Sequence, residues 1–345
     1  MSGVQVISIP EDADDQRLDR FLRRVFPQLK QGQIEKMCRK GELRLDGGRV
    51  KAATRVFAGQ NLRVPPIAPA SDTKPKSPEI SAADAQLMKD AVLFLDEHII
   101  ALNKPAGLPV QGGSKQTRHI DGLSAVFAED DNKPKLVHRL DRDTSGVLIL
   151  ARTGQAAKAM AKAFQSREMR KIYWGAVAGA PKPSNGTIRF GLVKSPGHGP
   201  NQAGEKMHCL HPRDVETTPG AKHATTDYTV IENLGGRVSW LAMVPVTGRT
   251  HQLRAHIAEL GNPIIGDGKY GGNSQENLGD GWGAQLGGGI SRKLHLHARS
   301  LSFKHPMTGR DMFIEAPLPP HMEKTWAEFD WRTDQTSRDP FEDLI

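Results

Sequence analysis

Residues 64–86, VPPIAPASDTKPKSPEISAADAQ, divide the chain into two unequal parts. The stretch is rich in proline, serine and alanine, so it has too few large apolar side chains to bury a core of its own. We expect a small domain over residues 15–64, a linker over residues 65–88, a larger domain over residues 89–320 and a C-terminal tail over residues 321–345. The last part of this tail, WRTDQTSRDPFEDLI (residues 331–345), is polar and is expected to be disordered. The 345 residues provide enough chain for two cores.

The positive charge of the chain is concentrated in the smaller domain. The formal net charge is +8, whereas residues 16–64 alone contain thirteen Lys and Arg against four Asp and Glu. Such an imbalance favours a nucleic acid as the partner. The two cysteines are too few for a disulfide framework, and neither a signal peptide nor a membrane-spanning segment is evident. We expect a cytoplasmic protein that makes no membrane contact and works as a monomer.

Two short helices and a small sheet are predicted within the basic segment. In RLDRFLRRVFPQLK (residues 17–30), four apolar residues recur at helical spacing: Leu18, Phe21, Leu22 and Val25. In QGQIEKMCRKGELRL, Ile34 and Met37 are expected to join the same core, and Gly41 suits the left-handed cap of a helix. The residues that follow are typical of short strands with a tight turn at Asp46-Gly47.

Five basic residues are expected on the exposed face of these helices: Arg23, Arg24, Lys36, Arg39 and Lys40. Charged faces are usually only solvated, but acids are scarce here, which favours contacts with RNA phosphates. The pattern RLDRFL…QGQIEKMCRKGELRLDGGRVK…AGQNLRV resembles the S-four-type RNA-binding domain, first described in a small-subunit ribosomal protein, over most of residues 15–64. The resemblance implies that the two helices dock onto structured RNA.

The strongest candidate for chemistry is the loop VHRLDRDTSG (residues 137–146), which precedes the apolar run VLIL. Its carboxylate Asp141 has two interpretations: it ties down the loop by pairing with Arg139 or Arg142, or it reacts. Thr144 can bond the backbone or an RNA phosphate, and Gly146 permits a tight turn. The loop taken alone does not decide between the two interpretations.

Three further stretches place polar residues beside apolar ones. RKIYWGAVA (residues 170–178) alternates like a strand, with Tyr173 and Gly175 on one face. TGRTHQLRAH (residues 247–256) is rich in Arg and His, and LHLHARSLSFKHP (residues 294–306) begins with alternating Leu and His. Each stretch alone is explained by an ordinary structural role.

Together these stretches resemble the RluA family of pseudouridine synthases. HRLDRDTSG matches the family's signature loop, and KIY, GRTHQLR, GNPIIGDGKYGG and LHLHA follow in the family's order over about residues 90–318. With the basic module in front, the chain is similar to the RluC and RluD branch, whose members modify large-subunit (23S) ribosomal RNA. Two features depart from the family pattern: Gly175 stands where alanine is more usual, and GGNSQENLGDGWGAQLGGG (residues 271–289) is a glycine-rich insertion.

The resemblance implies a role for each candidate residue. Asp141 is the catalytic carboxylate, Arg254 pairs with it, and Tyr173 stacks on the target uracil, where its hydroxyl can help to remove the ring-carbon proton. Arg139 enters the space left by the flipped nucleotide, and Leu296 packs near the base. The remaining expected contacts, with the substrate or the RNA backbone, are His138, Thr144, Lys104 and Arg142.

The implied reaction breaks the glycosidic bond of uridine, rotates the uracil and joins its ring carbon to the ribose. Neither a redox change nor a second reactant is involved, so we expect no cofactor. Whether Asp141 attacks the base, attacks the sugar or removes a sugar proton stays open. Two His-containing stretches, MHCLHP (residues 207–212) and His295-x-His297, lack suitably spaced further ligands, so no metal is expected.

The predicted fold is α+β: a small RNA-binding domain, then a mixed, mainly antiparallel sheet flanked by helices. The expected function is the isomerisation of uridines to pseudouridine, with large-subunit ribosomal RNA as the substrate and partner. Two alternatives remain. One is a non-catalytic RNA-binding or ribosome-assembly factor that has kept the fold, and the other is a pseudouridine synthase that acts on transfer RNA.

Overall fold

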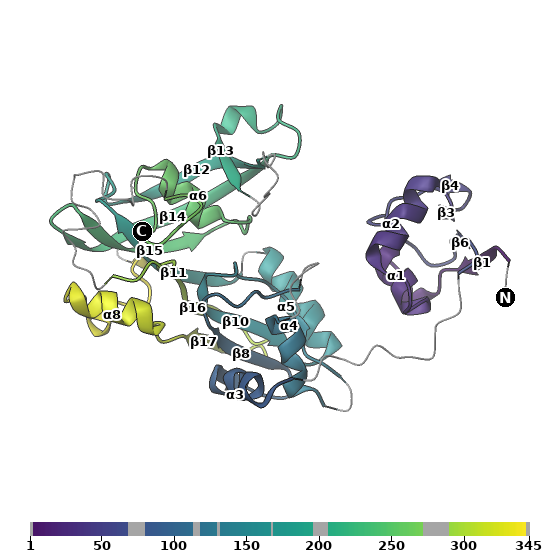
Figure 1. Ribbon diagram of the computed structural model, residues 1–345, viewed down its shortest axis with the longest axis horizontal. Helices are drawn as coiled ribbons and strands as arrows, with labels where there is room; N and C mark the ends of the chain where they lie inside the picture. Colours follow the sequence, from purple (N-terminus) through teal and green to yellow (C-terminus); the bar gives the residue numbers. More distant parts are fainter. Residues whose placement is uncertain are drawn as a thin grey trace. The chain divides into compact units, whose positions relative to one another are not determined.

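The computed structural model of the protein describes residues 3–67, 80–112, 118–129, 132–166, 168–195, 206–271 and 290–342. The chain forms two compact units, Met1–Glu79 and Ile80–Ile345 (Figure 1). Each unit has its own hydrophobic core and is described separately. Across the described ranges, every helix is too short or too polar to cross a membrane. The glycine-rich insertion lies outside the described residues from residue 272 onward.

The first unit packs two helices against short antiparallel strands. Its main sheet has the order β1-β6-β3-β4, and β2 pairs with β5. The core joins both helices to the strands through Leu18, Ile34 and Leu62. The elements are β1 (Gln5–Ser8), η1 (Glu11–Ala13), β2 (Gln16–Arg17), α1 (Leu18–Val25), α2 (Gln31–Lys40), β3 (Arg44–Leu45), β4 (Gly48–Arg49), β5 (Arg55–Val56) and β6 (Asn61–Val64).

The local predictions for this unit are largely confirmed. Helix α1 buries three of its four regularly spaced apolar residues, and the fourth, Val25, is exposed because the helix ends there. Gly41 follows the last residue of α2 with φ of +70°. Asp46 and Gly47 both have positive φ in the turn between β3 and β4, as a tight hairpin turn requires.

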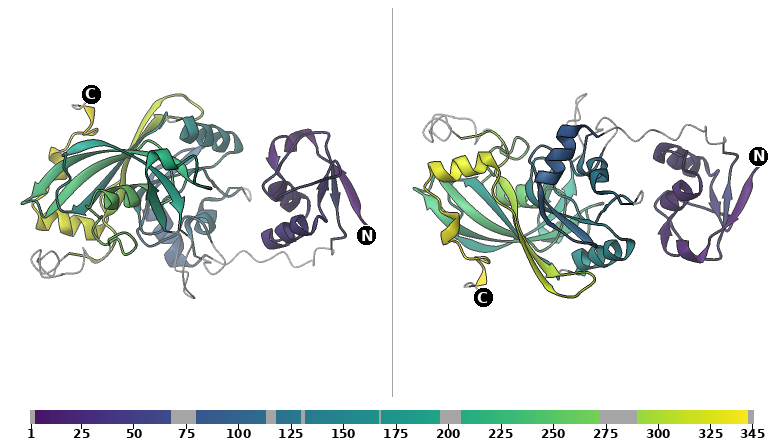
Figure 2. Two further views of the ribbon diagram at one scale, coloured as in Figure 1. Left: turned by 90° about the horizontal axis from the view of Figure 1, so that it is seen from above. Right: turned by 90° about the horizontal axis from the view of Figure 1, so that it is seen from below.

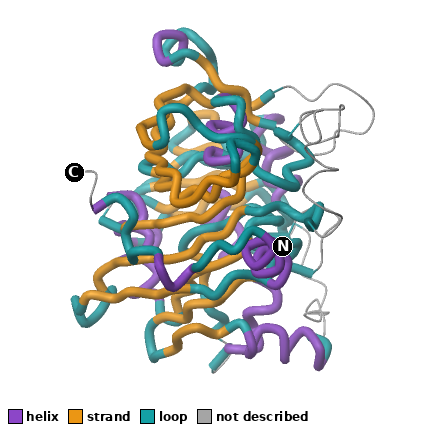
Figure 3. The backbone as a smooth tube through the Cα atoms, turned by 90° about the vertical axis from the view of Figure 1, so that its left-hand side faces the viewer, coloured by secondary structure: helices purple, strands orange, loops and turns teal. Residues whose placement is uncertain are grey.

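The second unit is built on one large sheet, whose strands run side by side in Figure 3. Its order is β13-β12-β14-β15-β11-β16-β10-β8-β7, with β17 on β16 and β9 on β10. Among the described strands, β10 and β16 pair in parallel and the other neighbours are antiparallel. The predicted mixed, mainly antiparallel sheet is therefore confirmed.

The strands of this sheet are β7 (Val92–Leu95), β8 (Ile99–Lys104), β9 (Lys135–Leu136), β10 (Ser145–Ala151), β11 (Arg170–Ala178), β12 (Asn185–Lys194), β13 (Met207–Leu210), β14 (Lys222–Leu234), β15 (Val238–Pro245), β16 (Leu296–Lys304) and β17 (Asp311–Glu315). The helices are α3 (Ala82–Asp90), α4 (Ile120–Leu123), η2 (Ser124–Phe127), α5 (Gly154–Ser166), η3 (Pro212–Asp214), α6 (Gln252–Glu259), α8 (Pro320–Glu328) and η5 (Thr333–Gln335).

Alternation along β11 and β15 separates two cores on opposite faces of the sheet. Trp174 and Trp240 pack with Trp326 of α8 on one face, which Figure 2 shows from below. Leu241 and Met243 pack on the other face, where the core includes α6 residues. The large sheet is thus covered by α8 on one side and by α6 on the other.

Three of the predicted boundaries are wrong. The first unit starts before residue 15, because β1 pairs with β6 and Ile9 belongs to the core. The expected linker is too long, because α3 occupies its end and buries Met88 in the second unit. The tail expected from residue 321 onward contains most of α8, and Trp331 and Phe341, in the part expected to be disordered, are buried in the core. The few apolar residues of these segments are spaced among many polar ones, so the composition of the segments did not indicate that they are folded and partly buried.

The start of β10 fixes the loop that precedes it. Gly146 lies between Lys104 of β8 and Ala298 of β16 in the sheet register. Its φ is +108°, and a Cβ atom there would lie 2.2 Å from the carbonyl oxygen of Ala298. Only glycine allows β16 to approach this closely, so Gly146 sets where the chain leaves the signature loop and enters the sheet.

We expect Gly146→Ala to lower the free energy of unfolding by at least about 2 kcal/mol, because the added methyl group collides with backbone and the φ angle becomes strained. The measurement is chemical denaturation of the purified chain. Gly186→Ala is the matched control, because its Cβ would meet Tyr228 at an ordinary 3.6 Å. Equal stability of the two variants would contradict the conclusion that β16 packs too closely on Gly146 for any side chain.

Candidate active site

The signature loop, β11, the turn before α6 and the start of β16 meet at a pocket of about 550 Å³, a size usual for ligand sites. All of the residues predicted to be catalytic line it: Asp141, Tyr173 and Arg254. The predicted substrate contacts line it as well: His138, Arg139, Thr144 and Leu296. The structure therefore brings together residues that lie far apart in the sequence.

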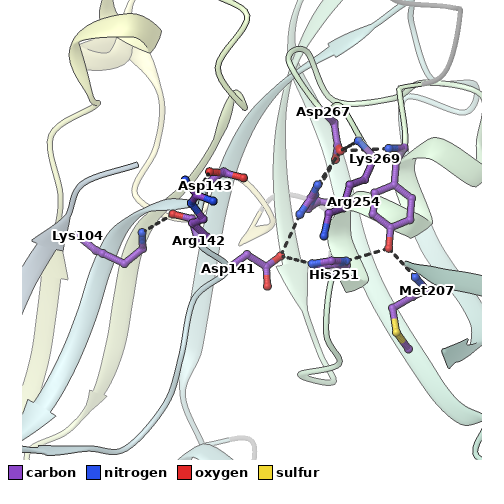
Figure 4. A network of polar contacts seen from close by, with 10 residues as sticks. Lys104, Asp141, Arg142, Asp143, Met207, His251, Arg254, Asp267 and Lys269 are labelled. Carbon is purple, nitrogen blue, oxygen red and sulfur yellow. Dashed lines mark hydrogen bonds and ion pairs between the residues drawn. The ribbon is translucent and has the colours of Figure 1, made fainter. Parts of the chain in front are cut away.

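Asp141 and Arg254 face each other in this pocket (Figure 4). Nη1 of Arg254 lies 3.6 Å from Oδ2 of Asp141. The Asp141 side chain is 21 % exposed, whereas that of Arg254 is 6 % exposed. A substrate can therefore reach the carboxylate, while the guanidinium behind it is shielded from water.

Arg254 is fixed by a second, fully buried carboxylate. Asp267 accepts hydrogen bonds from Nε and Nη2 of Arg254, each at 2.7 Å. Burial disfavours the charged guanidinium, but the bonds and the charge of Asp267 outweigh this and raise the pKa of Arg254 above its usual value. Oδ1 of Asp267 also accepts the backbone N–H of Tyr270 at 3.1 Å. The clamp leaves Nη1 to face Asp141.

Asp267 and Tyr270 were not identified as site residues from the sequence. Both lie in the stretch GNPIIGDGKYGG, whose match to the family was the signal that could have pointed to them. The Tyr270 ring lies under the Arg254 guanidinium, with Cζ 5.2 Å from the ring centroid. This stretch thus supplies the residues that hold the Arg254 side chain in place.

Tyr173 projects from β11 into the pocket beside Leu296. Burial, together with the nearby charge of Asp141, raises the pKa of the Tyr173 hydroxyl, so the phenol is neutral at physiological pH. At Gly175, on the same face of the strand, a Cβ would lie 2.8 Å from the terminal methyl group of Met243. Glycine in place of the more usual alanine therefore leaves room for Met243.

His251 lies on the other side of Asp141, with Nε2 3.9 Å from Oδ2 (Figure 4). It immediately precedes α6 and has φ of +52°, which is uncommon for a residue other than glycine. Its Nδ1 lies 3.0 Å from the hydroxyl oxygen of Tyr270. Burial lowers the pKa of His251 below its usual value, although the charge of Asp141 opposes this.

The remaining loop residues differ in what they can offer a substrate. Nε2 of His138 accepts the backbone N–H of Ile149 at 2.8 Å, and burial lowers the pKa of His138 to about 3. Its ring stacks on Phe164, with centroids 4.2 Å apart. This imidazole is a neutral brace for the loop at the pocket wall. Arg139 is exposed, and within the described residues the buried hydroxyl of Thr144 has no hydrogen-bond partner.

The prediction that Lys104 contacts RNA is wrong, because its side chain is completely buried. Its ammonium donates to the carbonyl oxygens of Pro105, Leu108 and Arg142 at 2.7, 2.8 and 2.9 Å. Burial lowers the pKa of Lys104 to about 7, although Asp143 and Asp141 act in the opposite direction. Lys104 therefore braces the signature loop from behind. Arg142 remains exposed.

The five basic residues predicted on the helices of the first unit are all exposed. Two of them have acidic neighbours: Arg24 pairs with Asp12 at 2.8 Å, and Lys40 with Glu42 at 3.5 Å. Among the described residues, the other three have no ion-pair partner: Arg23, Lys36 and Arg39. These three are the strongest candidates for phosphate contacts.

The histidines of the two His-containing stretches, residues 207–212 and 295–297, make contacts with hydroxyl groups. His295 lies 2.9 Å from the hydroxyl of Thr325, and His297 lies 2.9 Å from that of Ser145. His208 lies 3.1 Å from the hydroxyl of Ser195. In the described part of the chain, no three His, Cys, Asp or Glu side chains gather as a metal site requires.

Comparisons with known proteins agree with this geometry. The RNA pseudouridylate synthase family matches residues 98–259. Ribosomal large subunit pseudouridine synthase C of Vibrio vulnificus (strain CMCP6) is 33 % identical over 322 residues, which cover 93 % of this chain and 95 % of that one. Its namesake from Escherichia coli (strain K12) is 35 % identical over 321 residues, covering 92 % and 93 %.

A solved structure supports the same assignment. Human RNA Pseudouridylate Synthase Domain Containing 4 superposes with a TM-score of 0.57 at 27 % identity and covers 71 % of this chain and 95 % of its own. The fold and the pocket define an RNA-modifying isomerase. The chain belongs to the RNA pseudouridylate synthase family.

We expect Lys104→Met to lower the free energy of unfolding by about 2 kcal/mol, because three carbonyl oxygens lose their buried donor. The salt dependence of RNA affinity should stay as in the unaltered protein, because no phosphate contact is lost. Denaturation and a salt titration of RNA binding check both parts. Lys89→Met, at an exposed position on α3, is the control. An unchanged stability with a flatter salt dependence would restore the RNA-contact prediction.

Proposed function

We propose that the protein converts specific uridines of large-subunit ribosomal RNA to pseudouridine. The observation that carries the proposal is the Asp141 carboxylate 3.6 Å from the clamped Arg254, in one pocket with Tyr173. The choice of RNA is supported by the two ribosomal large subunit pseudouridine synthases, which align with at least 92 % of this chain, basic unit included. A ribosomal RNA substrate places the enzyme in the cytoplasm.

The proposed chemistry uses the three groups in different ways. The bond between C1′ of the ribose and N1 of uracil breaks, the base turns, and C1′ joins C5, which loses its proton while N1 gains one. Asp141 is the carboxylate that reacts, and Arg254 pairs with it. The face of Tyr173 holds the detached base beside Leu296. All of these groups come from one chain, which is consistent with a monomer, and the rearrangement within one substrate uses no cofactor.

The target nucleotide must leave its stack to reach Asp141, which costs a few kcal/mol. We propose that Arg139, exposed at the rim of the pocket, fills the space that the base leaves, and that Arg142 contacts the backbone nearby. The first unit adds affinity as an S-four-type RNA-binding domain through Arg23, Lys36 and Arg39. The large sheet carries the chemistry, and the basic unit holds the RNA.

Asp141→Asn should abolish pseudouridine formation while RNA affinity stays close to that of the unaltered protein, because the amide keeps the shape but not the charge. The assay maps pseudouridine chemically in large-subunit ribosomal RNA transcripts incubated with each variant. Equal product from both proteins would remove Asp141 from the reaction. No product from either protein would favour a non-catalytic RNA-binding factor. Product formed only in transfer RNA would identify transfer RNA as the substrate.

Replacing Arg23, Lys36 and Arg39 together with Ala should weaken RNA binding and flatten its salt dependence. Each lost phosphate contact is expected to reduce the log–log salt slope by roughly 0.7 to 0.9. Single-turnover rates at saturating RNA should survive, because the pocket lies in the other unit.

The matched control removes the same charge from exposed positions of the second unit: Lys89, Lys182 and Lys324. We expect this control to bind with the salt slope of the unaltered protein. A triple variant of the basic unit that bound normally but lost single-turnover chemistry would contradict the proposed division of roles.

A further inference from the structure

Three contacts connect the backbone of β13 to the catalytic carboxylate. The N–H of Met207 donates to the hydroxyl oxygen of Tyr270 at 2.8 Å. That oxygen lies 3.0 Å from Nδ1 of His251. Nε2 of His251 faces Oδ2 of Asp141 at 3.9 Å (Figure 4). None of the roles proposed so far uses His251 or the Tyr270 hydroxyl.

The direction of these contacts favours one position for the imidazole proton. A backbone N–H can only donate, so the Tyr270 oxygen is an acceptor toward Met207. In the arrangement that also uses the phenol hydrogen, this hydrogen bonds Nδ1 of His251, which is then unprotonated. Burial raises the pKa of Tyr270 to about 12, so this hydrogen is present at neutral pH. A neutral His251 therefore carries its hydrogen on Nε2, the nitrogen that faces Asp141.

The charges around His251 come from several elements. Asp141 of the signature loop and Asp267 favour its protonated form, whereas Arg254 of α6 and Lys269 oppose it. Burial is the largest influence and keeps the pKa below its usual value. At neutral pH, His251 is thus an N–H donor directed at Asp141 rather than a second cation.

Both neighbours of Asp141 approach the same oxygen. Arg254 Nη1 and His251 Nε2 both make their closest approach to Asp141 at Oδ2, at 3.6 and 3.9 Å, and the other carboxylate oxygen, Oδ1, points away from the two side chains (Figure 4). We propose that His251, oriented by Tyr270, is a positioning residue that holds Oδ2 of Asp141, so that Oδ1 is the oxygen that reacts with the nucleotide. The proposal rests on the function proposed above. We expect the 3.9 Å separation to shorten to a hydrogen bond when the substrate is bound.

The backbone of His251 lies in the left-handed region. Its φ of +52° is a conformation that glycine adopts at lower cost and that histidine, like asparagine, tolerates better than most other residues. The turn is held by Gln252, which accepts hydrogen bonds from Thr247 Oγ1 at 2.6 Å and from the backbone N–H of Arg249 at 3.1 Å.

The tautomer can be measured without RNA. Long-range ¹⁵N–¹H spectra of histidine-labelled protein distinguish Nδ1-H from Nε2-H imidazole, and the spectrum of His251→Asn identifies the signals of His251. We expect Nε2-H in the unaltered protein and a mixture of both forms in Tyr270→Phe, which keeps the ring beneath Arg254. Tyr228→Phe, which loses a hydroxyl bonded to Pro183 at 2.9 Å, is the control and should leave His251 unchanged.

The positioning role is tested by two conservative replacements. Glutamine can place an N–H near the position of Nε2, whereas asparagine reaches only the position of Nδ1. We therefore expect single-turnover pseudouridine formation by His251→Gln to exceed that of His251→Asn by at least about tenfold, with equal RNA affinity, because one donor to a charged group is kept or lost. Backbone strain alone predicts the opposite order, because asparagine tolerates positive φ better than glutamine.

Each result has a distinct meaning. A charged or Nδ1-H imidazole in the unaltered protein at neutral pH, or an asparagine variant as fast as the glutamine variant, would overturn the positioning role. An unaltered protein that forms no pseudouridine in large-subunit ribosomal RNA, while His251 carries its hydrogen on Nε2, would overturn the proposed function and leave the tautomer assignment intact. The proposal expects that His251 of the unaltered protein carries its hydrogen on Nε2 and that His251→Gln forms pseudouridine faster than His251→Asn.

Discussion

The buried ion pair between Arg254 and Asp267 is the interaction on which the site depends. Removing two charges from water costs several kcal/mol per ion, and only good geometry and full hydrogen bonding offset that cost. Two parallel bonds of 2.7 Å meet this requirement and fix the plane of the guanidinium. The remaining nitrogen, Nη1, is thereby held toward Asp141. The partly exposed Asp141 carboxylate therefore has a rigid, positively charged partner on its buried side.

The sheet brings the two sides of the pocket together. The signature loop enters β10, which pairs in parallel with β16 at Gly146 and Ala298. Lys104 ties this loop to residues 105–108, because its ammonium donates to the carbonyl oxygen of Arg142 in the loop and to those of Pro105 and Leu108. β16 in turn pairs with β11, so Tyr173 and Leu296 reach the same pocket from neighbouring strands. The reactive geometry is therefore built on strands, with the loop residues attached to them at fixed points.

Local sequence patterns predicted individual helices and turns well, but they predicted poorly where the folded units begin and end. Helical spacing identified α1, and glycine identified the end of α2, because both depend on neighbours in the chain. The polar C-terminal residues hid Trp331 and Phe341, whose burial depends on a core supplied by β11 and β15. Met88 in α3 was missed for the same reason. The composition of a segment is an average over its residues. Whether a single side chain is buried depends on its packing against elements that lie far away in the sequence.

The sequence by itself determined the family, the mixed sheet and the candidate residues Asp141, Tyr173 and Arg254, because their motifs are short and follow one another in a fixed order. The tertiary structure decided what surrounds them. It turned Lys104 from an expected RNA contact into a buried brace, and it added Asp267, Tyr270 and His251 to the site. Hydrogen-bond direction and burial arise between residues far apart in the chain, so only the folded arrangement could assign these roles.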